Sequence, residues 1–247
     1  MSLDRIRLAS LHDKVMNAEQ AAAFIQDGMT VGMSGFTRAG EAKAVPLALV
    51  KRAKADPLKI TLITGASLGN DLDKQLTEAG VLARRLPFQV DNTLRKAINK
   101  GEVMFIDQHL SETVEQMRNK QLKKPDIAVI EAVAITEDGG IIPTTSVGNS
   151  ASFAIFAEKV IVEINTNLSP AFEGLHDIYI PSYRPTRQPI PLTEVDERIG
   201  TQAINIDPSK IVGIVINSEF HDSPSTVTEP DDETQGIANH LIAFFEK

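Results

Sequence analysis

The segment Ile127-Ala-Val-Ile-Glu-Ala-Val133 constrains the fold more than any other stretch of the sequence. It is a nearly continuous apolar run of strand length that Glu131 alone interrupts. Such a run is expected where helices cover both faces of a parallel sheet, because neither face of the strand then meets water. The segment therefore predicts a buried strand in an α/β fold.

Segments typical of strands and helices alternate on both sides of this run. Further strands are expected over 29–33, 59–64, 103–106, 141–142, 159–164 and 210–216. Helices are expected over 18–27, 44–54, 71–79, 91–100, 110–119 and 151–158, with a last one starting near Asp231. Asn17 and Gln20 have the spacing of a capping box, and Asp91 and Gly101 have the character of a helix start and stop. The alternation predicts an open, mostly parallel sheet with helices on both faces.

Two stretches near the C-terminus differ from this pattern. Residues 166–198 contain five prolines and little periodicity, so we expect an extended excursion over the surface that is functional or covered by a partner. The final helix carries an apolar stripe and no stop signal before Lys247, which predicts that the natural chain continues. We therefore divide the chain into an α/β domain over 1–220 and, over 221–247, a linker with the start of a helix that leads to an absent C-terminal domain.

Composition limits the classes of function. The 247 residues suffice for a buried core, and the net charge of −8 disfavours nucleic acid or an anionic membrane as a partner. The sequence has no cysteine, which excludes a disulfide framework, a thiolate nucleophile and a cysteine-based metal site. We find neither a signal peptide at the N-terminus nor an apolar run near the roughly 18 residues of a membrane span, so we expect a cytoplasmic location.

Three loops with small or hydroxylated residues follow predicted strands: Ser34–Gly40, Thr64–Asn70 and Thr144–Ser150. Because ligands bind at the carboxyl ends of strands in open α/β sheets, these loops side by side would form the floor of a cleft. Hydroxyls and free N–H groups in the third loop could hold a carboxylate or an acyl oxygen. The alternatives are a tight turn for the first loop and helix capping by Ser146, Asn149 or Ser150 for the third.

Other polar residues give weaker signals. The five histidines lack metal-ligand spacing and are expected at the surface or in loops; they are His12, His109, His176, His221 and His240. Glu131 is either an acid facing a cleft or a buried glutamate satisfied by backbone or arginine. Lys43 and the pair Arg84-Arg85 could meet phosphates, with solvated surface charge as the alternative. No nucleophile elbow or phosphate-binding glycine-lysine loop is present.

Four longer segments carry a resemblance to a known family. They are Ser34-Gly-Phe-Thr-Arg-Ala-Gly-Glu-Ala-Lys-Ala-Val-Pro46, Leu62-Ile-Thr-Gly-Ala-Ser67, Ala134-Ile-Thr-Glu-Asp-Gly-Gly-Ile-Ile-Pro-Thr-Thr-Ser-Val-Gly-Asn-Ser150 and Glu158-Lys-Val-Ile-Val-Glu163. Together they resemble the N-terminal half of the acetyl-CoA hydrolase/transferase family, which are class I CoA-transferases such as succinyl-CoA:acetate CoA-transferases. The resemblance covers essentially the whole chain.

The resemblance implies a split active site. In this family two related α/β domains face each other, and the N-terminal one contributes the Gly-Phe-Thr and Ser-Val-Gly-Asn loops. The substrate-binding residues expected here are Gly35, Phe36, Thr37, Gly40, Thr64, Gly65, Ser146, Val147, Gly148 and Asn149. The nucleophilic glutamate belongs to the C-terminal half, so we expect no catalytic residue and no metal ligand in this chain, and no activity without that half.

The resemblance also implies the ligands and partners. The substrates would be an acyl-CoA, acetyl- or succinyl-CoA, and a short-chain carboxylate, with coenzyme A as a substrate and no further cofactor. The full-length enzyme would be a homodimer. One departure is local: the family commonly has Gly-Tyr-Pro-Lys where this chain has Gly40-Glu-Ala-Lys43, and a small residue in place of Arg38. This puts the acyl or acceptor preference in doubt.

Three functions stay open from the sequence. The first is CoA transfer, and the second is acyl-CoA hydrolysis, in which water replaces the acceptor carboxylate. The third is a non-catalytic ligand-binding or sensor module, since such sheets also recognise sugar phosphates. The chain is either a piece of a longer enzyme or a natural half whose partner subunit supplies the rest.

Overall fold

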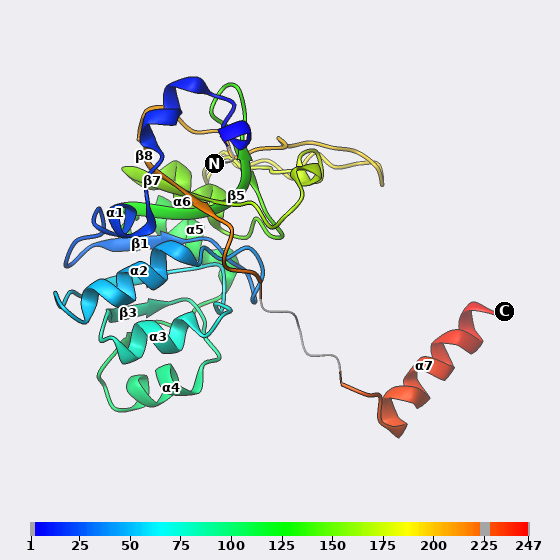
Figure 1. Cartoon of the computed structure of the whole chain (residues 1–247). Coiled ribbons are helices and arrows are strands. Elements are labelled where there is room, and N and C mark those ends of the chain that lie inside the picture. The colour runs from blue at the N-terminus through cyan, green and yellow to red at the C-terminus, as the bar shows by residue number, and fades with distance from the viewer. Residues whose placement is uncertain (1–2, 223–227, 247) are drawn as a thin grey trace.

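The computed structural model of the protein describes residues 3–222 and 228–246, and they contain one eight-stranded sheet (Figure 1). The strands are β1 (Thr30–Met33), β2 (Ile60–Ile63), β3 (Leu82–Leu86), β4 (Met104–Phe105), β5 (Ile127–Ile135), β6 (Ile141–Pro143), β7 (Lys159–Asn165) and β8 (Ile211–Asn217). Seven of them follow the order β4-β3-β2-β1-β5-β7-β8 in parallel, and β6 pairs antiparallel with β5. The predicted open, mostly parallel sheet is confirmed.

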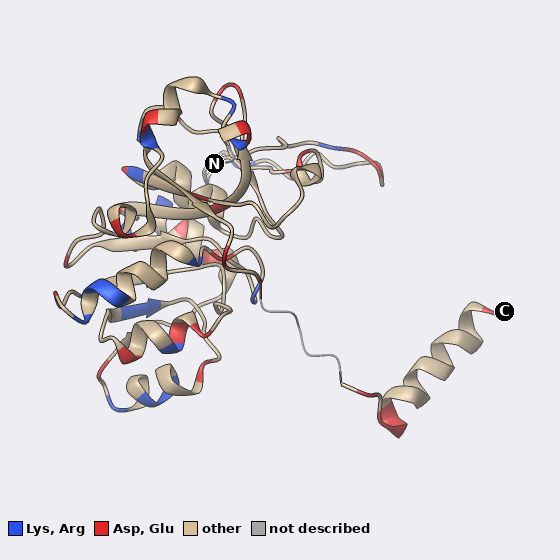
Figure 2. Ribbon diagram, viewed as in Figure 1, with Lys and Arg blue, Asp and Glu red and all other residues tan. Residues whose placement is uncertain are grey.

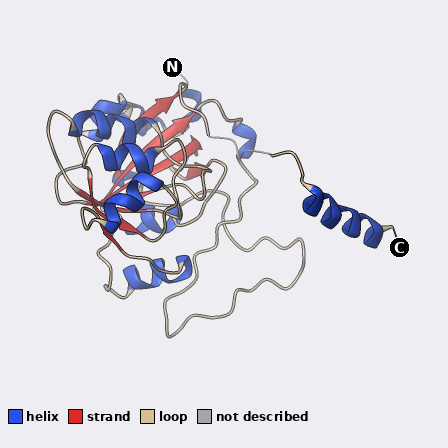
Figure 3. Cartoon of the chain, turned by 90° about the horizontal axis from the view of Figure 1, so that it is seen from below, coloured by secondary structure: helices blue, strands red, loops and turns tan. Residues whose placement is uncertain are grey.

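Helices lie on both faces of this sheet (Figures 1 and 3). They are α1 (Ala18–Ala22), α2 (Ala44–Ala53), α3 (Leu72–Glu78), α4 (Asn92–Asn99), α5 (Leu110–Arg118), α6 (Ser150–Phe156) and α7 (Asp232–Phe245). The predicted capping box of Asn17 and Gln20 starts α1, and the Asp91 side chain caps α4 by accepting from Leu94 N–H. Local sequence signals thus define where these helices begin.

Strand β5 explains why the sheet needs both helical layers. All nine of its residues are buried, and the first four alternate between two apolar clusters. Ile127 and Val129 pack in the cluster that contains α1 and α2, whereas Ala128 and Ile130 pack with α6. The apolar run that Glu131 interrupts is therefore covered on each face by a different set of helices.

Two predicted elements differ from the structure. Strand β3 was not expected, because Arg84 and Arg85 break the apolar pattern; Arg85 is nevertheless buried against Asp73, which makes the segment compatible with the sheet. The predicted helix over 18–27 ends at Ala22, and the Arg52 guanidinium donates to the carbonyls of Ala22 and Ile25 at 3.0 and 2.7 Å. The helix ends here because these carbonyl oxygens accept hydrogen bonds from Arg52 and not from the N–H groups of a further helical turn.

The extended stretch and the final helix that the sequence predicts near the C-terminus are both present. Residues 173–198 contain neither strand nor α-helix and extend from the body as a loop (Figure 3). Helix α7 is present and carries no lysine or arginine, as Figure 2 shows by its tan colour after the acidic first turn. None of its described residues is buried, and Phe244 and Phe245 are 72% and 79% exposed. Part of the predicted linker, residues 223–227, lies outside the described residues.

No helix in the described part of the chain is long and apolar enough to cross a membrane.

Gly32 in β1 sits where α6 approaches the sheet, and this contact is testable. A Cβ at Gly32 would lie 2.8 Å from Cγ and 2.9 Å from Cβ of Phe153. We expect Gly32→Ala to lower the free energy of unfolding by about 1–3 kcal/mol, because α6 must move away from the sheet. Urea denaturation of both proteins measures this change.

Gly236→Ala in α7 is the matched control, since a Cβ there meets no atom within 4 Å. It should leave the urea midpoint of the sheet unchanged. An unchanged midpoint for Gly32→Ala would contradict the tight contact between α6 and β1.

Candidate functional site

The three loops singled out in the sequence meet at one edge of the sheet. Residues 34–40 and 64–70 follow the carboxyl ends of the neighbouring strands β1 and β2. Residues 144–150 reach the same place by a different route, because β5 continues past β1 and β6 runs back along it until Pro143 pairs with Ala132. The hairpin therefore returns the third loop to the level at which β1 ends.

Glycines bring the three loops into contact. A Cβ on Gly65 would lie 2.6 Å from the Gly35 carbonyl oxygen, so these loops approach backbone to backbone. A Cβ on Gly40 would lie 2.7 Å from Ser146 Oγ, and one on Gly148 would lie 3.6 Å from Phe36 Cβ. The substrate-binding residues predicted from the resemblance thus belong to loops that lie together.

The first loop is a tight turn at its tip. Phe36 and Ala39 exchange two backbone hydrogen bonds, and Thr37 and Arg38 both have positive φ, at 48° and 70°. Ser146 Oγ donates to the Ala39 carbonyl at 2.7 Å and joins this turn to the third loop. The interpretation of the first loop as a tight turn is therefore correct for its local structure. The same turn also contacts the third loop at the edge of the sheet where the three loops meet.

Two other predicted residues have specific local contacts. The Thr64 hydroxyl faces inward and donates to the Ala66 carbonyl, so it shapes its own loop. Asn149 precedes α6, but its side chain makes no capping hydrogen bond, and its Nδ2 is buried without a hydrogen-bond partner among the described residues. Helix capping by Asn149 is thus not what the structure shows.

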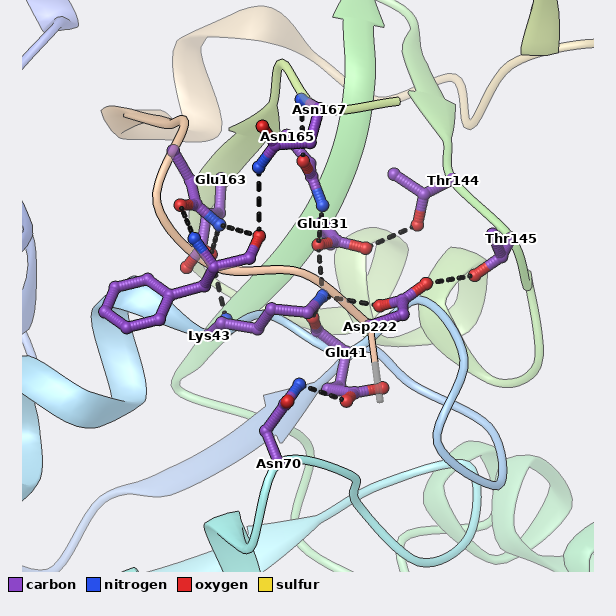
Figure 4. Close-up of polar contacts among 12 residues, drawn as sticks. Glu41, Lys43, Asn70, Glu131, Thr144, Thr145, Glu163, Asn165, Asn167 and Asp222 are labelled. Atoms are coloured by element: carbon purple, nitrogen blue, oxygen red, sulfur yellow. Dashed lines mark hydrogen bonds and ion pairs between the residues drawn. The ribbon is translucent and has the colours of Figure 1, made fainter. Parts of the chain in front are cut away.

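Lys43 lies directly beneath these loops and is the centre of a buried polar cluster (Figure 4). Its side chain is 0% exposed, and its ammonium group contacts three oxygen atoms. The distances are 2.7 Å to the Glu41 carbonyl oxygen, 2.5 Å to Glu131 Oε1 and 2.7 Å to Asp222 Oδ1. The first two contacts are hydrogen bonds, whereas the third is an ion pair, because Asp222 Oδ1 has no hydrogen-bond partner among the described residues.

The backbone of Lys43 is held by a second carboxylate. Glu163 on β7 accepts hydrogen bonds from the N–H groups of residues 43, 44 and 45 at 2.8, 2.9 and 3.0 Å. These N–H groups begin α2 and have no partner within the helix, so Glu163 caps the helix from another element. Asn217 Nδ2 donates to the same carboxylate at 3.2 Å. This cap fixes the position of the Lys43 backbone.

Glu131 lies on β5 in register with Glu163 on β7. One of its oxygens accepts from Lys43 and from Asn165 Nδ2 at 2.9 Å, and the other accepts from Thr144 Oγ1 at 2.6 Å. Burial raises the pKa of Glu131 to about 7, although Lys43 opposes the shift. The interpretation as a buried, satisfied glutamate is correct, but its partners are lysine, threonine and asparagine. A side chain enclosed in this way is not placed to attack a substrate.

Glu41 is a third buried carboxylate, at the position where the chain departs from the family pattern. Asn70 Nδ2 donates to its Oε1 at 2.9 Å, and its Oε2 has no hydrogen-bond partner among the described residues. Burial raises the pKa of Glu41, with Lys43 opposing. The contact with Asn70 ties the residue directly after the first loop to the second loop (Figure 4).

Arg85 supports the second loop from below. Its guanidinium donates to both oxygens of Asp73, at 2.8 and 3.2 Å, and to the Ala66 carbonyl at 3.0 Å. Arg85 and Lys43 are both fully buried, so neither is the solvated surface charge proposed as the alternative for them. Arg84, by contrast, is exposed.

The site also contains residues that the sequence analysis did not single out: Glu163, Asn165 and Asp222. A signal existed for the first, because Glu163 interrupts an apolar strand just as Glu131 does, and adjacent strands place the two in register. Asp222 had no such signal, since it lies far along the chain in a polar segment. Among the described residues no group of His, Cys, Asp and Glu could hold a metal ion.

Comparisons with known proteins give a family model and curated relatives for this chain. The family model for the acetyl-CoA hydrolase/transferase N-terminal domain matches residues 2–216. Succinyl-CoA:acetate CoA-transferase of Clostridium kluyveri is 43% identical over 245 residues, covering 98% of this chain and 45% of that protein. Acetyl-CoA hydrolase of Kluyveromyces lactis is 40% identical over 254 residues, covering 98% and 48%.

One solved structure shows the same fold. The crystal structure of RipA from Yersinia pestis superposes with a TM-score of 0.67 at 17% identity and covers 98% of this chain and 50% of that one. The chain thus spans about half the length of the curated relatives that it matches.

The raised pKa of Glu131 makes stability depend on pH. Because the fold raises this pKa from its ordinary 4.5 to about 7, the folded state binds more protons than the unfolded state between these values. Stability is then greatest at low pH and falls as pH rises through about 7. We expect Glu131 to lower the free energy of unfolding by about 2 kcal/mol between pH 5.5 and 8.

Urea denaturation at the two pH values measures this difference. Glu131→Gln should flatten the dependence by that amount, whereas Glu78→Gln, at an exposed position, should leave it as in the original chain. Equal pH dependence in the original chain and in Glu131→Gln would show that Glu131 does not titrate in this range.

Proposed function

Since the chain belongs to the acetyl-CoA hydrolase/transferase family through its N-terminal domain, we propose that it is the N-terminal half of a CoA-transferase. The proposed reaction moves CoA between acetyl- or succinyl-CoA and a short-chain carboxylate. The match of the N-terminal domain model over residues 2–216 carries the proposal. The convergence of the three loops supports it, because they provide one wall for a ligand.

In this proposal the second half of the enzyme supplies the nucleophile. A glutamate carboxylate from that half attacks the thioester carbonyl and expels CoA as a thiolate, leaving a mixed anhydride. The thiolate then attacks the glutamyl carbonyl, which forms a glutamyl-CoA thioester and releases the first carboxylate. The acceptor carboxylate reverses these two steps. The full-length enzyme would be a homodimer.

The buried cluster around Lys43 is consistent with a nucleophile that comes from the second half of the enzyme. The side chain of Glu131 is 0% exposed, and so is residue Glu163. The carboxylate of Glu131 holds Lys43, and that of Glu163 caps α2. They stabilise the wall and are not available as nucleophiles. The role proposed for this half is therefore to bind and orient the acyl and carboxylate groups through the loops.

Acyl-CoA hydrolysis is the second candidate. The observation that favours it is the similarity to a protein named acetyl-CoA hydrolase, at 40% identity. Water would then replace the acceptor carboxylate at the glutamyl-CoA thioester. A sensor of sugar phosphates has no specific support from the structure, and ligand binding distinguishes it from both enzymes.

We expect the chain alone to show no exchange of CoA between succinyl-CoA and acetate. A fusion to the part of the Clostridium kluyveri relative that this chain does not cover should form acetyl-CoA and succinate from them. Chromatography of the acyl-CoA products, with and without acetate, separates transfer from hydrolysis. Appreciable exchange by the chain alone would contradict the proposal, and binding of glucose 6-phosphate but not of CoA would favour the sensor.

Contact between the first two loops is required in this account. In the fusion, Gly65→Ala places a Cβ 2.6 Å from the Gly35 carbonyl oxygen and forces these loops apart. We expect the rate of CoA transfer to fall by about tenfold to a hundredfold, because the substrate groups are misplaced.

Gly236→Ala is the matched control and should retain the original rate, since its Cβ meets no atom within 4 Å. Circular dichroism checks that both variants are folded. A Gly65→Ala fusion as active as the original would remove the second loop from the proposed site.

A further inference from the structure

The carboxylate of Asp222 occupies a two-point site at the edge of the loops. Its Oδ1 lies 2.7 Å from Lys43 Nζ, and its Oδ2 accepts a hydrogen bond from Thr145 Oγ1 at 3.1 Å. The first partner is a buried ammonium group that forms an ion pair, and the second is a hydroxyl donor in the third loop (Figure 4). An ion pair to one oxygen and a hydroxyl hydrogen bond to the other can together hold the two oxygens of a carboxylate.

Asp222 is the most accessible of the oxygen ligands that surround Lys43. Its side chain is 22% exposed, whereas Glu131 is 0% exposed and lies within the central strand β5. Glu131 has further donors in Thr144 and Asn165, whereas Asp222 contacts Lys43 and Thr145 among the described residues. Asp222 can therefore leave without disturbing the sheet.

The chain before Asp222 is anchored independently. Asn217 Oδ1 accepts from the N–H groups of Glu219 and Phe220 at 3.0 Å, and Asn167 Nδ2 donates to the Phe220 carbonyl at 3.2 Å. These contacts hold the turn after β8 whether or not Asp222 contacts Lys43. A change at Asp222 thus leaves this turn in place.

Charge favours replacement of Asp222 over addition of another anion. Glu41, Glu131 and Glu163 already lie buried near the one ammonium group, and burial raises the pKa of each. A further anion beside them would be repelled. An external carboxylate that takes the place of Asp222 leaves the number of charges around Lys43 unchanged.

We propose that Lys43 Nζ and Thr145 Oγ1 form a binding site for the carboxylate group of a small substrate, which Asp222 occupies in the free chain. The ligand class is a short-chain mono- or dicarboxylate, so this inference rests on the proposed function and deepens it. Asp222 then competes with substrate, and its removal increases carboxylate affinity.

Isothermal titration of the 247-residue chain with acetate and with succinate tests this site. We expect Asp222→Ala to bind succinate about fivefold to tenfold more tightly than the original chain, because the intramolecular competitor is gone. Asp222→Asn should change affinity in the same direction by a smaller factor. Thr145→Val in the Asp222→Ala background should cancel at least half of the gain in binding free energy.

Two controls define the chemistry. Asp13→Asn removes an exposed carboxylate elsewhere and should leave succinate affinity unchanged, and acetamide, which has the shape of acetate without its charge, should not bind Asp222→Ala. Equal affinity of the original chain and both Asp222 variants would overturn the proposal, as would a gain that Thr145→Val leaves intact. Because the titration contains no CoA and no second half, a fusion inactive in CoA transfer would leave this result standing.

Discussion

A lysine ammonium group enclosed in the protein is the feature on which the arrangement of this edge of the sheet depends. Lys43 is 0% exposed, and an unpaired charge there would be very costly, so oxygen atoms must surround its ammonium group at all times. Those oxygen ligands come from Glu41, directly after the first loop, from β5 and from the segment after β8. One side chain thereby joins parts of the chain that are distant in sequence.

The carboxylates around Lys43 carry this order outward to the loops. Glu163 caps α2 from β7, Glu131 accepts from Thr144 at the start of the third loop, and Glu41 accepts from Asn70 in the second. The loops expected to bind substrate are thus supported from below by charged hydrogen bonds and in contact with one another through glycines. Such support restricts their motion, which is what orienting a substrate requires.

Much of the fold could be predicted from the sequence, because it depends on local patterns. The apolar run around Glu131 required a sheet covered on both faces, and capping residues such as Asn17 and Asp91 marked helix starts. Strand β3 could not be predicted, because the burial of Arg85 depends on its ion pair with Asp73. Asp73 lies in a different element, α3, and is not part of the local pattern of residues 82–86. A local pattern carries no information about such a partner.

The candidate site was predictable in its loops and not in its charges. Small residues after strands indicated where Gly35, Gly65 and Gly148 would meet, and the resemblance to the family named the same loops. The cluster beneath them depends on ion pairs across long separations in sequence, from Lys43 to Glu131 and to Asp222. Taken singly, each of these charges was expected at a surface or left open, because sequence alone does not show which charges meet.

The most direct test of the proposed site is a crystal structure of the fusion with the second half, from crystals grown in the presence of succinate. The account predicts succinate between the three loops, with one carboxylate bound by Lys43 Nζ and Thr145 Oγ1 and with Asp222 displaced. Succinate bound elsewhere, without contact to residues 34–40, 64–70 or 144–150, would contradict it.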